Sequence, residues 1–490
     1  MDEAVLLPGA PRISDEDRSH LEDIRHAEEE LRGHFAGKMA VNDDLDRTLV
    51  SFQANKDEAG HRWCKYKEGF SAELIRYVIR EAGIKSGVVL DPFAGSGTAL
   101  FVASESGLDT VGIELLPSSA EIIEVRAEIA HSDHFKLAEA IQKFRECASW
   151  DRKGNVQGFP HLRITAGAFP QETEHSLGRY LFEAGQVRDP LVRRVLRFAA
   201  MCVLEPISYT RKDGQYLRWD QRSGRCLGKK KFDKGRIIPF GEAIRTKLAE
   251  IVADLTRQQG LLFDPIPIAA HAGKIELRRG SCLDIMPKMK GRAFNAIITS
   301  PPYCNRYDYT RTYALELAML GVGEDEIRKV RQAMLSCTVE NREKTHLDSR
   351  FSPGCYKAAA AAFESQEVLT RILRYLESCR TSGSINNPGI PRMVRNYFWE
   401  SGLLIFESAR VLKKNGVFVM VNDNVRYQGA HVPVDLILSD FAEKAGFNVE
   451  TIWVLPKGKG NSSQQMGLHG REEIRKCVYI WRLERNQPVS

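Results

Sequence analysis

The stretch that decides the fold is residues 88–98, Val-Val-Leu-Asp-Pro-Phe-Ala-Gly-Ser-Gly-Thr. Its first three residues, Val-Val-Leu, are apolar and two of them are β-branched, which predicts a short buried strand at 88–91. Gly95 and Gly97 let the next turn bend tightly and let its backbone approach a ligand closely. A helix is expected from Thr98, and its positive end would face a carboxylate held at the turn. Strand, glycine turn and helix in this order predict a nucleoside-binding site.

A second strand is expected at 110–114, and it ends on an acidic residue, Glu114. At this place a carboxylate can accept hydrogen bonds from both ribose hydroxyls of a bound nucleoside. A dehydrogenase would have another glycine near position 100, where this chain has Leu100. A nicotinamide oxidoreductase is therefore disfavoured.

Five further strands are expected along the chain, at 275–280, 295–300, 416–422, 448–456 and 475–483. Helical segments separate most of them, so the pattern predicts an α/β fold with a doubly wound sheet of seven strands. No helix separates the last two strands, which are expected to form an antiparallel hairpin. Two insertions, 131–274 and 320–394, interrupt the alternation.

A second conspicuous segment, Thr299-Ser300-Pro301-Pro302-Tyr303, directly follows the strand expected at 295–300. The two prolines restrict where the carbonyls of Ser300 and Pro301 can point. A hydroxyl beside a rigid carbonyl can accept both protons of an exocyclic amino group, and an aromatic ring can stack on a planar base for about 1–3 kcal/mol. We interpret Ser300, Pro301, Pro302 and Tyr303 as the catalytic residues.

Together, the two segments resemble the cofactor-binding and catalytic motifs of the S-adenosylmethionine-dependent DNA amino-methyltransferases, which methylate cytosine N4 or adenine N6. The resemblance implies a Rossmann-like methyltransferase sheet, S-adenosylmethionine as the cofactor and a flipped base in double-stranded DNA as the substrate. Two further blocks, around Phe70 and around Ser281, are similar to other cofactor blocks of the family. At Ser281 the family often has Asp, so this chain departs from the pattern there. The expected cofactor-binding residues are Phe70, Ser71, Asp91, Pro92, Phe93, Gly95, Gly97, Thr98, Glu114, Ser281 and Cys282.

The methylated position is expected to be an exocyclic amine. Cytosine C5 methylation would require a cysteine placed after a proline, and no proline of this chain precedes a cysteine. By the resemblance, Ser300 at the head of the motif favours cytosine N4 over adenine N6. Adenine N6, and the same chemistry on RNA, remain as alternatives. A catalytically idle DNA-binding protein is the alternative from another class.

Positive charge is concentrated in one part of the first insertion. Residues 209–236 hold ten Lys or Arg against three Asp, although the whole chain has a net charge of only +6. Such a stretch can neutralise DNA phosphates. The candidate DNA-binding residues are Arg211, Lys212, Arg218, Arg222, Lys229, Lys230, Lys231, Arg306 and Arg311.

Composition is ordinary for a globular protein, with 43% hydrophobic and 27% charged residues in 490. No run is long and apolar enough for a membrane helix, and no secretion signal is recognisable, so a cytoplasmic protein without a membrane partner is expected. The ten cysteines form no C-x-x-C pair, which argues against a zinc ribbon or a disulfide framework. No metal is expected. A restriction endonuclease partner would be a separate polypeptide, because no metal-binding nuclease constellation is recognisable.

These observations predict a catalytic domain in three pieces. The expected division is an N-terminal charged helical segment at 1–60, catalytic parts at 61–130, 275–319 and 395–490, a target-recognition region at 131–274 and a helical insertion at 320–394.

Overall fold

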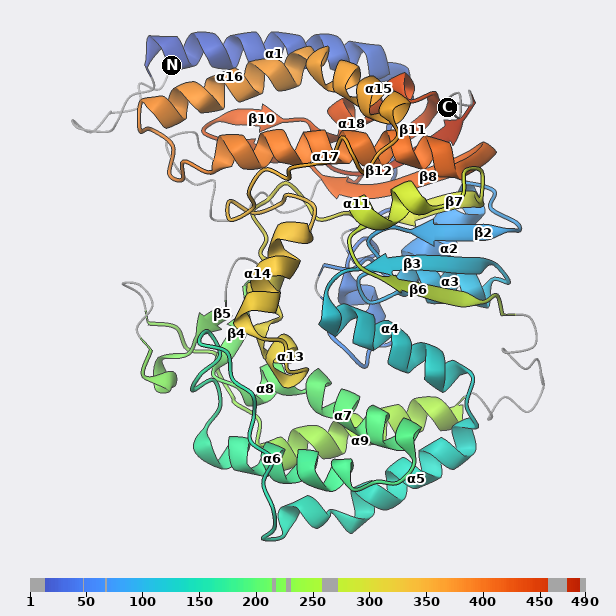
Figure 1. The fold of residues 1–490 in the computed structure, drawn as a ribbon, viewed down its shortest axis with the longest axis vertical. Coiled ribbons are helices and arrows are strands. Elements are labelled where there is room, and N and C mark those ends of the chain that lie inside the picture. The colour runs from blue at the N-terminus through green and yellow to red at the C-terminus, as the bar shows by residue number, and fades with distance from the viewer. Residues whose placement is uncertain are drawn as a thin grey trace.

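The computed structural model describes residues 14–46, 48–66, 68–213, 217–225, 231–257, 272–456 and 474–484. An upper part contains a central β-sheet between layers of helices, and a lower part is made mainly of helices (Figure 1). Within these ranges, no helix combines the length and the apolar character needed to cross a membrane.

The central sheet has eight strands in the order β1-β11-β12-β8-β7-β2-β3-β6. Its strands are β1 (Met39–Val41), β2 (Val88–Asp91), β3 (Asp109–Glu114), β6 (Ile275–Arg279), β7 (Phe294–Thr299), β8 (Leu412–Asp423), β11 (Phe447–Val454) and β12 (Lys476–Leu483). Only β12 runs antiparallel to its neighbours, and it forms the expected terminal hairpin with β11. The seven expected strands are all present, but the strand count was wrong. The eighth, β1, is a three-residue edge strand that pairs with β11.

The residues of β8 show why helices cover both faces of the sheet. Phe418 and Met420 point to one face, into a core shared with α15–α18, whereas Val417, Val419 and Val421 point to the other, against α2 and α3. Successive side chains of a strand alternate between faces, so an unbroken apolar run needs cover on both.

The helices fall into three groups. Around the sheet lie α1 (Asp15–Phe35), α2 (Ala72–Glu81), α3 (Thr98–Glu105), α4 (Pro117–Ala130), α11 (Cys282–Ile285), α15 (Pro353–Glu364), α16 (Glu367–Thr381), α17 (Ile390–Val411) and α18 (Val434–Lys444). Three helices, α12 (Tyr309–Thr312), α13 (Ala314–Met319) and α14 (Glu324–Ala333), connect the sheet to the lower part. The first insertion forms α5 (His134–Cys147), α6 (Gln171–Gly185), α7 (Pro190–Cys202), α8 (Leu204–Ile207) and α9 (Phe240–Arg257).

The helices of the first insertion have their own hydrophobic core, which includes Trp150, Tyr180, Phe198 and Phe240. This core continues into α13 and α14 and into α4 beside the sheet, so the lower part is packed against the upper part. Two small antiparallel hairpins complete the structure: β4 (Thr210–Lys212) with β5 (Leu217–Trp219), and β9 (Val425–Tyr427) with β10 (Ala430–Val432).

Strand order fixes where a ligand can bind. From β2 the chain moves outward in one direction to β3 and β6, and then returns to place β7 and β8 on the other side of β2. In open α/β sheets, ligands bind at the carboxyl ends of the strands where the order reverses. This switch point lies between β2 and β7, the two strands that precede the glycine turn and the Ser-Pro-Pro-Tyr segment.

Candidate active site

The two motif loops leave the sheet side by side. β2 and β7 are parallel neighbours, with Val89 opposite Ala296 and Leu90 opposite Ile297. At the ends of these strands, Thr299 Oγ1 donates a hydrogen bond to Asp91 Oδ1 at 2.6 Å. A buried side-chain bond therefore ties the glycine turn to the catalytic loop.

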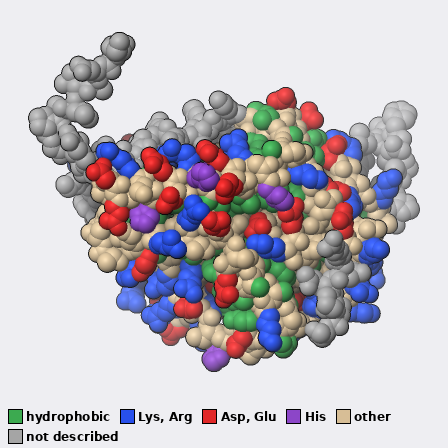
Figure 2. Space-filling view, turned by 90° about the horizontal axis from the view of Figure 1, so that it is seen from above, with side chains coloured by type: hydrophobic (Ala, Val, Ile, Leu, Met, Phe, Trp, Pro, Cys, Tyr) green, Lys and Arg blue, Asp and Glu red, His purple; other side chains and the backbone are tan. Residues whose placement is uncertain are grey.

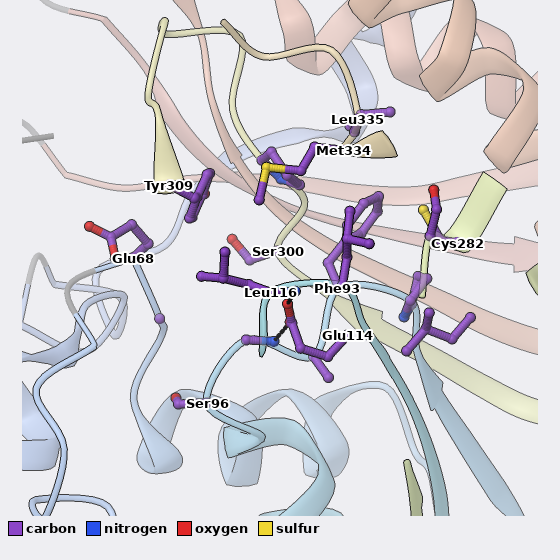
Figure 3. Close-up of a pocket in the computed structure, with 18 of the residues that line it drawn as sticks. Glu68, Phe93, Ser96, Glu114, Leu116, Cys282, Ser300, Tyr309, Met334 and Leu335 are labelled. Carbon is purple, nitrogen blue, oxygen red and sulfur yellow. Dashed lines mark hydrogen bonds between the residues drawn. The ribbon is translucent and has the colours of Figure 1, made fainter. Parts of the chain in front are cut away.

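A cavity of about 730 Å³ lies at this switch point. Figure 3 shows Phe93 and Glu114 in its wall, with Ser300 and Cys282. Of the expected site residues, the cavity is lined by Phe70, Pro92, Phe93, Gly95, Thr98, Glu114, Ser281, Cys282, Ser300 and Pro302. Residues from both motifs thus share one wall.

Glu114 is fixed at the cavity by backbone donors. Gly95 N–H donates to one carboxylate oxygen at 2.7 Å and Leu116 N–H to the other at 2.6 Å. Burial raises the pKa of Glu114 to about 7, although these backbone hydrogen bonds favour the ionised form. Each carboxylate oxygen retains capacity for another donor, so the pair can accept two hydroxyls of a ligand.

The glycines of the turn are required by conformation and by space. Gly95 and Gly97 have φ values of +55° and +79°, in the left-handed region. A Cβ at Gly97 would lie 2.8 Å from Ile123 Cγ1, and one at Gly95 would lie 3.0 Å from Tyr66 Cε1. The helix α3 begins directly afterwards at Thr98, with no side-chain cap on its first N–H groups.

Three expected cofactor-binding residues have other roles in the structure, and none lines the cavity. The Asp91 carboxylate is buried and accepts from Thr299 and from the Phe93 N–H. The Ser71 hydroxyl caps α2 by accepting from Leu74 N–H, and it donates to the Leu49 carbonyl. Gly97 packs behind the turn. These residues shape the turn and the ends of the strands. Membership of a sequence motif does not determine whether a side chain faces the cavity.

A second cavity of about 790 Å³ lies next to the first. Its walls include Tyr303, Tyr307 and Tyr309, with Asn305 after the catalytic loop. Tyr303 and Ser300 share a hydrogen bond of 3.0 Å between their hydroxyls. Burial raises the pKa of the Tyr303 phenol above its ordinary value, and the nearby Asp423 charge adds to this effect. Tyr303 therefore stays neutral.

The catalytic segment lies between the two cavities. Ser300 and Pro302 line the first cavity, whereas Tyr303 lines the second. Glu68 and Tyr309 line both. Pro301 lines neither and provides backbone geometry between its neighbours. One ligand in each cavity would therefore meet at this segment.

Arg211 and Arg218 are exposed on the β4–β5 hairpin. Their guanidinium groups lie 6.0 Å and 4.1 Å from the centre of the Phe232 ring. Lys212, between them on the expected basic surface, is instead buried. Its ammonium donates to Glu316 at 2.6 Å and lies 4.1 Å from the centre of the Tyr313 ring. The alternation of β4 turns Lys212 inward, so it is not a surface contact for phosphate.

The remaining DNA-binding candidates differ in their surroundings. Lys231 is exposed, and Arg222 bonds Asp220 at 2.7 and 2.8 Å while its side chain stays 46% exposed. Arg311 forms ion pairs with Asp308 and Glu340 at 3.3 and 3.0 Å. Arg306 has φ +69°, and its buried Nε finds no hydrogen-bond partner among the described residues. Lys229 and Lys230 lie outside the described residues.

Several residues of the cavity walls were not predicted from sequence. Met334 and Leu335 follow α14 in the second insertion, and Tyr66 and Tyr309 lie beside the two motifs. No local sequence pattern marks Met334 and Leu335, because only the tertiary packing at the end of α14 brings them to the cavity. Glu68 lies two residues before Phe70, in a block that resembles a cofactor block, but nothing in the surrounding sequence marks this acid as a site residue.

The described ranges contain neither a cluster of potential metal ligands nor a disulfide bond. There, no group of three or more His, Cys, Asp or Glu side chains is arranged to hold a metal ion. Nine cysteines lie in these ranges, and all are free.

Comparison with known proteins agrees with the geometry of the site. A family described as DNA methylase (N6_N4_Mtase) matches residues 22–125. The chain is 48% identical over 480 residues to the type II methyltransferase M.AvaI of Nostoc sp., covering 96% of both chains. It is 40% identical to the type II methyltransferase M.BsoBI of Geobacillus stearothermophilus, over 89% of this chain and 88% of the relative. No solved structure matches significantly. With such similarity along nearly its whole length, the protein belongs to the type II DNA methyltransferases of the N6/N4 amino-methyltransferase family.

Proposed function

We propose that the protein transfers a methyl group from S-adenosylmethionine to the exocyclic amino group of a base flipped out of double-stranded DNA, with cytosine N4 favoured over adenine N6. One observation carries this proposal. Glu68 and Tyr309 line both cavities, and the Ser300–Tyr303 segment lies between them. A methyl donor and a nucleobase need such an arrangement, because transfer without a covalent intermediate depends mainly on positioning.

The first cavity fits the cofactor. Its lining combines a fixed carboxylate, a glycine turn at a helix N-terminus and apolar side chains, as small-molecule sites do. The Glu114 carboxylate would hold the ribose hydroxyls, and the first N–H groups of α3 would face the carboxylate of the methionine moiety. Phe70 and Phe93 would contribute apolar walls, and Ser281 and Cys282 would lie near the adenine. When bound, S-adenosylmethionine supplies an electrophilic methyl group on sulfur.

The second cavity fits a planar base. Tyr303 would stack on the base and Ser300 would accept a proton of its amino group, while Pro301 fixes the backbone between them. If the Tyr303 hydroxyl donates to Ser300, the Ser300 oxygen keeps one lone pair for that amino group, and its own proton remains available for a ring nitrogen. The expelled base leaves the duplex at a cost of a few kcal/mol, which phosphate contacts offset.

The preference for cytosine rests on Ser300 at the head of the segment, which, by the resemblance described above, favours cytosine N4 over adenine N6. Cytosine also places its N3 acceptor beside the amino group, within reach of a hydroxyl donor. Adenine N6 is the alternative.

The first insertion, 131–274, supplies target recognition. Arg211 and Arg218 project from β4 and β5 while their neighbours anchor the hairpin, an arrangement suited to base edges and phosphates. Arg306 follows the catalytic segment and is half-buried, so the exposed part of its side chain would reach a phosphate near the extruded nucleotide. The face over α1 and α16 carries acidic and basic side chains interspersed (Figure 2), which suits DNA less well.

For the cellular setting we propose a cytoplasmic enzyme of restriction-modification, for which any partner restriction endonuclease would be a separate polypeptide. The six-part division of the chain given above is its domain organisation.

Labelled-methyl transfer tests the proposal. The purified protein is incubated with S-adenosylmethionine labelled in its methyl group, together with unmodified DNA amplified from a bacterial genome, or with total RNA. Nucleosides are then separated by mass spectrometry. Labelled N4-methylcytosine in DNA supports the proposal, and labelled N6-methyladenine in DNA selects the alternative base. Label in RNA alone would show that the substrate is RNA and not DNA.

A further inference from the structure

Glu68 occupies the junction of the two cavities. Figure 3 shows it with Tyr309 on the side of the first cavity where Ser300 also lies. The same two residues line the second cavity, and Glu68 is the one carboxylate among the described residues to line both. A group transferred from one cavity to the other passes beside this side chain.

Two tyrosines that follow the catalytic loop hold the Glu68 carboxylate in place. The Tyr307 hydroxyl donates to one oxygen and the Tyr313 hydroxyl to the other. Tyr313 is itself fixed, because its ring stacks on Tyr66 with centres 5.1 Å apart and the Lys212 ammonium lies 4.1 Å from its centre. A carboxylate has about four lone-pair sites, so a group held by two hydroxyl donors is preorganised and can still take a proton.

Methylation of an amine creates a need for such a group. When the amino nitrogen forms its new bond to carbon, it acquires a positive charge and must lose one of its two original protons. Ser300 can accept a hydrogen bond from the amino group. A neutral hydroxyl is too weak a base to keep an additional proton at neutral pH, so Ser300 cannot be the final acceptor. A positioned carboxylate can act as the base.

The other carboxylates of the cavities are less suited. Glu114 lines only the first cavity, where its two oxygens accept the Gly95 and Leu116 N–H groups, so it does not face the cavity assigned to the base. Asp213 and Asp423 line only the second cavity, where they form ion pairs with Arg218 and Lys476 at 3.6 and 3.0 Å.

We propose that Glu68 is a catalytic residue that accepts the proton released by the target amino group. The nitrogen lone pair forms the bond to the methyl carbon, and the carbon–sulfur bond breaks with its electron pair on sulfur. The N–H bond then breaks with its pair on nitrogen, and the proton passes to a Glu68 oxygen and later to water. The proposal rests on the methyl-transfer function proposed above.

Three variants at this position test the role. E68Q keeps the size but removes the basicity, E68D keeps a carboxylate, and E68A opens space for added formate. E81Q, at an exposed acid on α2 that bonds Arg80, is the matched control. Methyl transfer to amplified genomic DNA is measured with enzyme in excess. Binding of S-adenosylhomocysteine by calorimetry and binding of the same DNA by fluorescence anisotropy give readouts that do not depend on turnover.

We expect E68Q and E68A to transfer methyl at least about 100-fold more slowly, a loss ordinary for a missing general base. Both binding constants stay within about threefold of wild type, E68D retains part of the rate, and formate accelerates E68A but not wild type. E81Q behaves as wild type.

Two results would overturn the inference while leaving methyl transfer intact: E68Q within threefold of the wild-type rate, or a loss that follows weaker binding and is not restored by formate. A wild-type protein that transfers no methyl group to DNA would instead refute the underlying function.

Discussion

Thr299 and Asp91 join the two halves of the site, because the 2.6 Å hydrogen bond between their side chains connects the ends of β7 and β2. The Asp91 carboxylate is buried, and burial raises its pKa to about 7. The hydrogen bond from Thr299 partly offsets this cost by favouring the ionised form. The relation between the donor and acceptor cavities thus depends on a contact that touches neither ligand.

Replacing Thr299 with Val removes this donor without changing the shape of the side chain. A carboxyl whose pKa is raised on folding destabilises the fold only where it ionises, so the penalty is absent at low pH and full above about 7. T299V raises the pKa of Asp91 further, and we expect it to lower stability by about 1–3 kcal/mol at pH 8 and by less at pH 6. Thermal unfolding at both pH values measures this. T299S, which keeps the hydroxyl, is the control. Equal losses at both pH values would contradict the account.

Cofactor affinity should depend on pH through Glu114. Its pKa of about 7 means that the free protein takes up a proton there as the pH falls. Ribose hydroxyls donate best to the ionised carboxylate, so affinity for S-adenosylhomocysteine should weaken about tenfold between pH 8 and pH 6. Calorimetry measures the change. E114Q should bind more weakly at pH 8 and lose the pH dependence, and an E114Q protein that keeps the wild-type pH profile would refute this role.

Gly97 should tolerate no side chain. G97A introduces both an unfavourable backbone conformation and a Cβ within 2.8 Å of Ile123. Gly83 also has a positive φ, +66°, but a Cβ added there would have no other atom within 4 Å, so G83A isolates the backbone cost of about 1 kcal/mol. We expect G97A to lower the melting temperature more than G83A and to weaken S-adenosylhomocysteine binding. Equal melting temperatures would show that the turn can open to accept the methyl group.

Tyr303 should contribute through its ring more than through its hydroxyl. Stacking on a base is worth about 1–3 kcal/mol, so Y303A should reduce methyl transfer by about 5- to 150-fold. Y303F keeps the ring and loses only the bond to Ser300, so its loss should be smaller. Rates with saturating cofactor measure the difference. Wild-type rates for Y303A would remove Tyr303 from the active site.

Much of the fold and part of the site could be predicted from sequence, for physical reasons visible in particular residues. The strands at the switch point, β2 and β7, each contain a short apolar run and are followed by a loop with proline, so local sequence is enough to predict them. The edge strand β1 was not predicted, because three residues are too few to show a strand periodicity. Its pairing with β11 joins residues more than 400 positions apart in the sequence.

The directions of side chains were less predictable. Asp91 and Ser71 belong to the expected blocks, but their polar atoms are engaged by Thr299 and by the start of α2. Lys212 lies in a basic stretch and is nevertheless buried against Glu316. Met334 enters the cavity wall from an insertion without any recognisable motif. Each of these placements depends on tertiary packing, which a single sequence does not display.

The central claim is that the two adjoining cavities hold donor and base face to face. The most direct measurement is a crystal structure with S-adenosylhomocysteine and a duplex that contains the site identified by modification-sensitive sequencing. The account predicts the ribose on Glu114, the extruded base against Tyr303 and its amino group at Ser300, with sulfur and nitrogen separated by the space of one methyl group. A base that remains stacked in the duplex, or a cofactor bound away from Glu114, would contradict it.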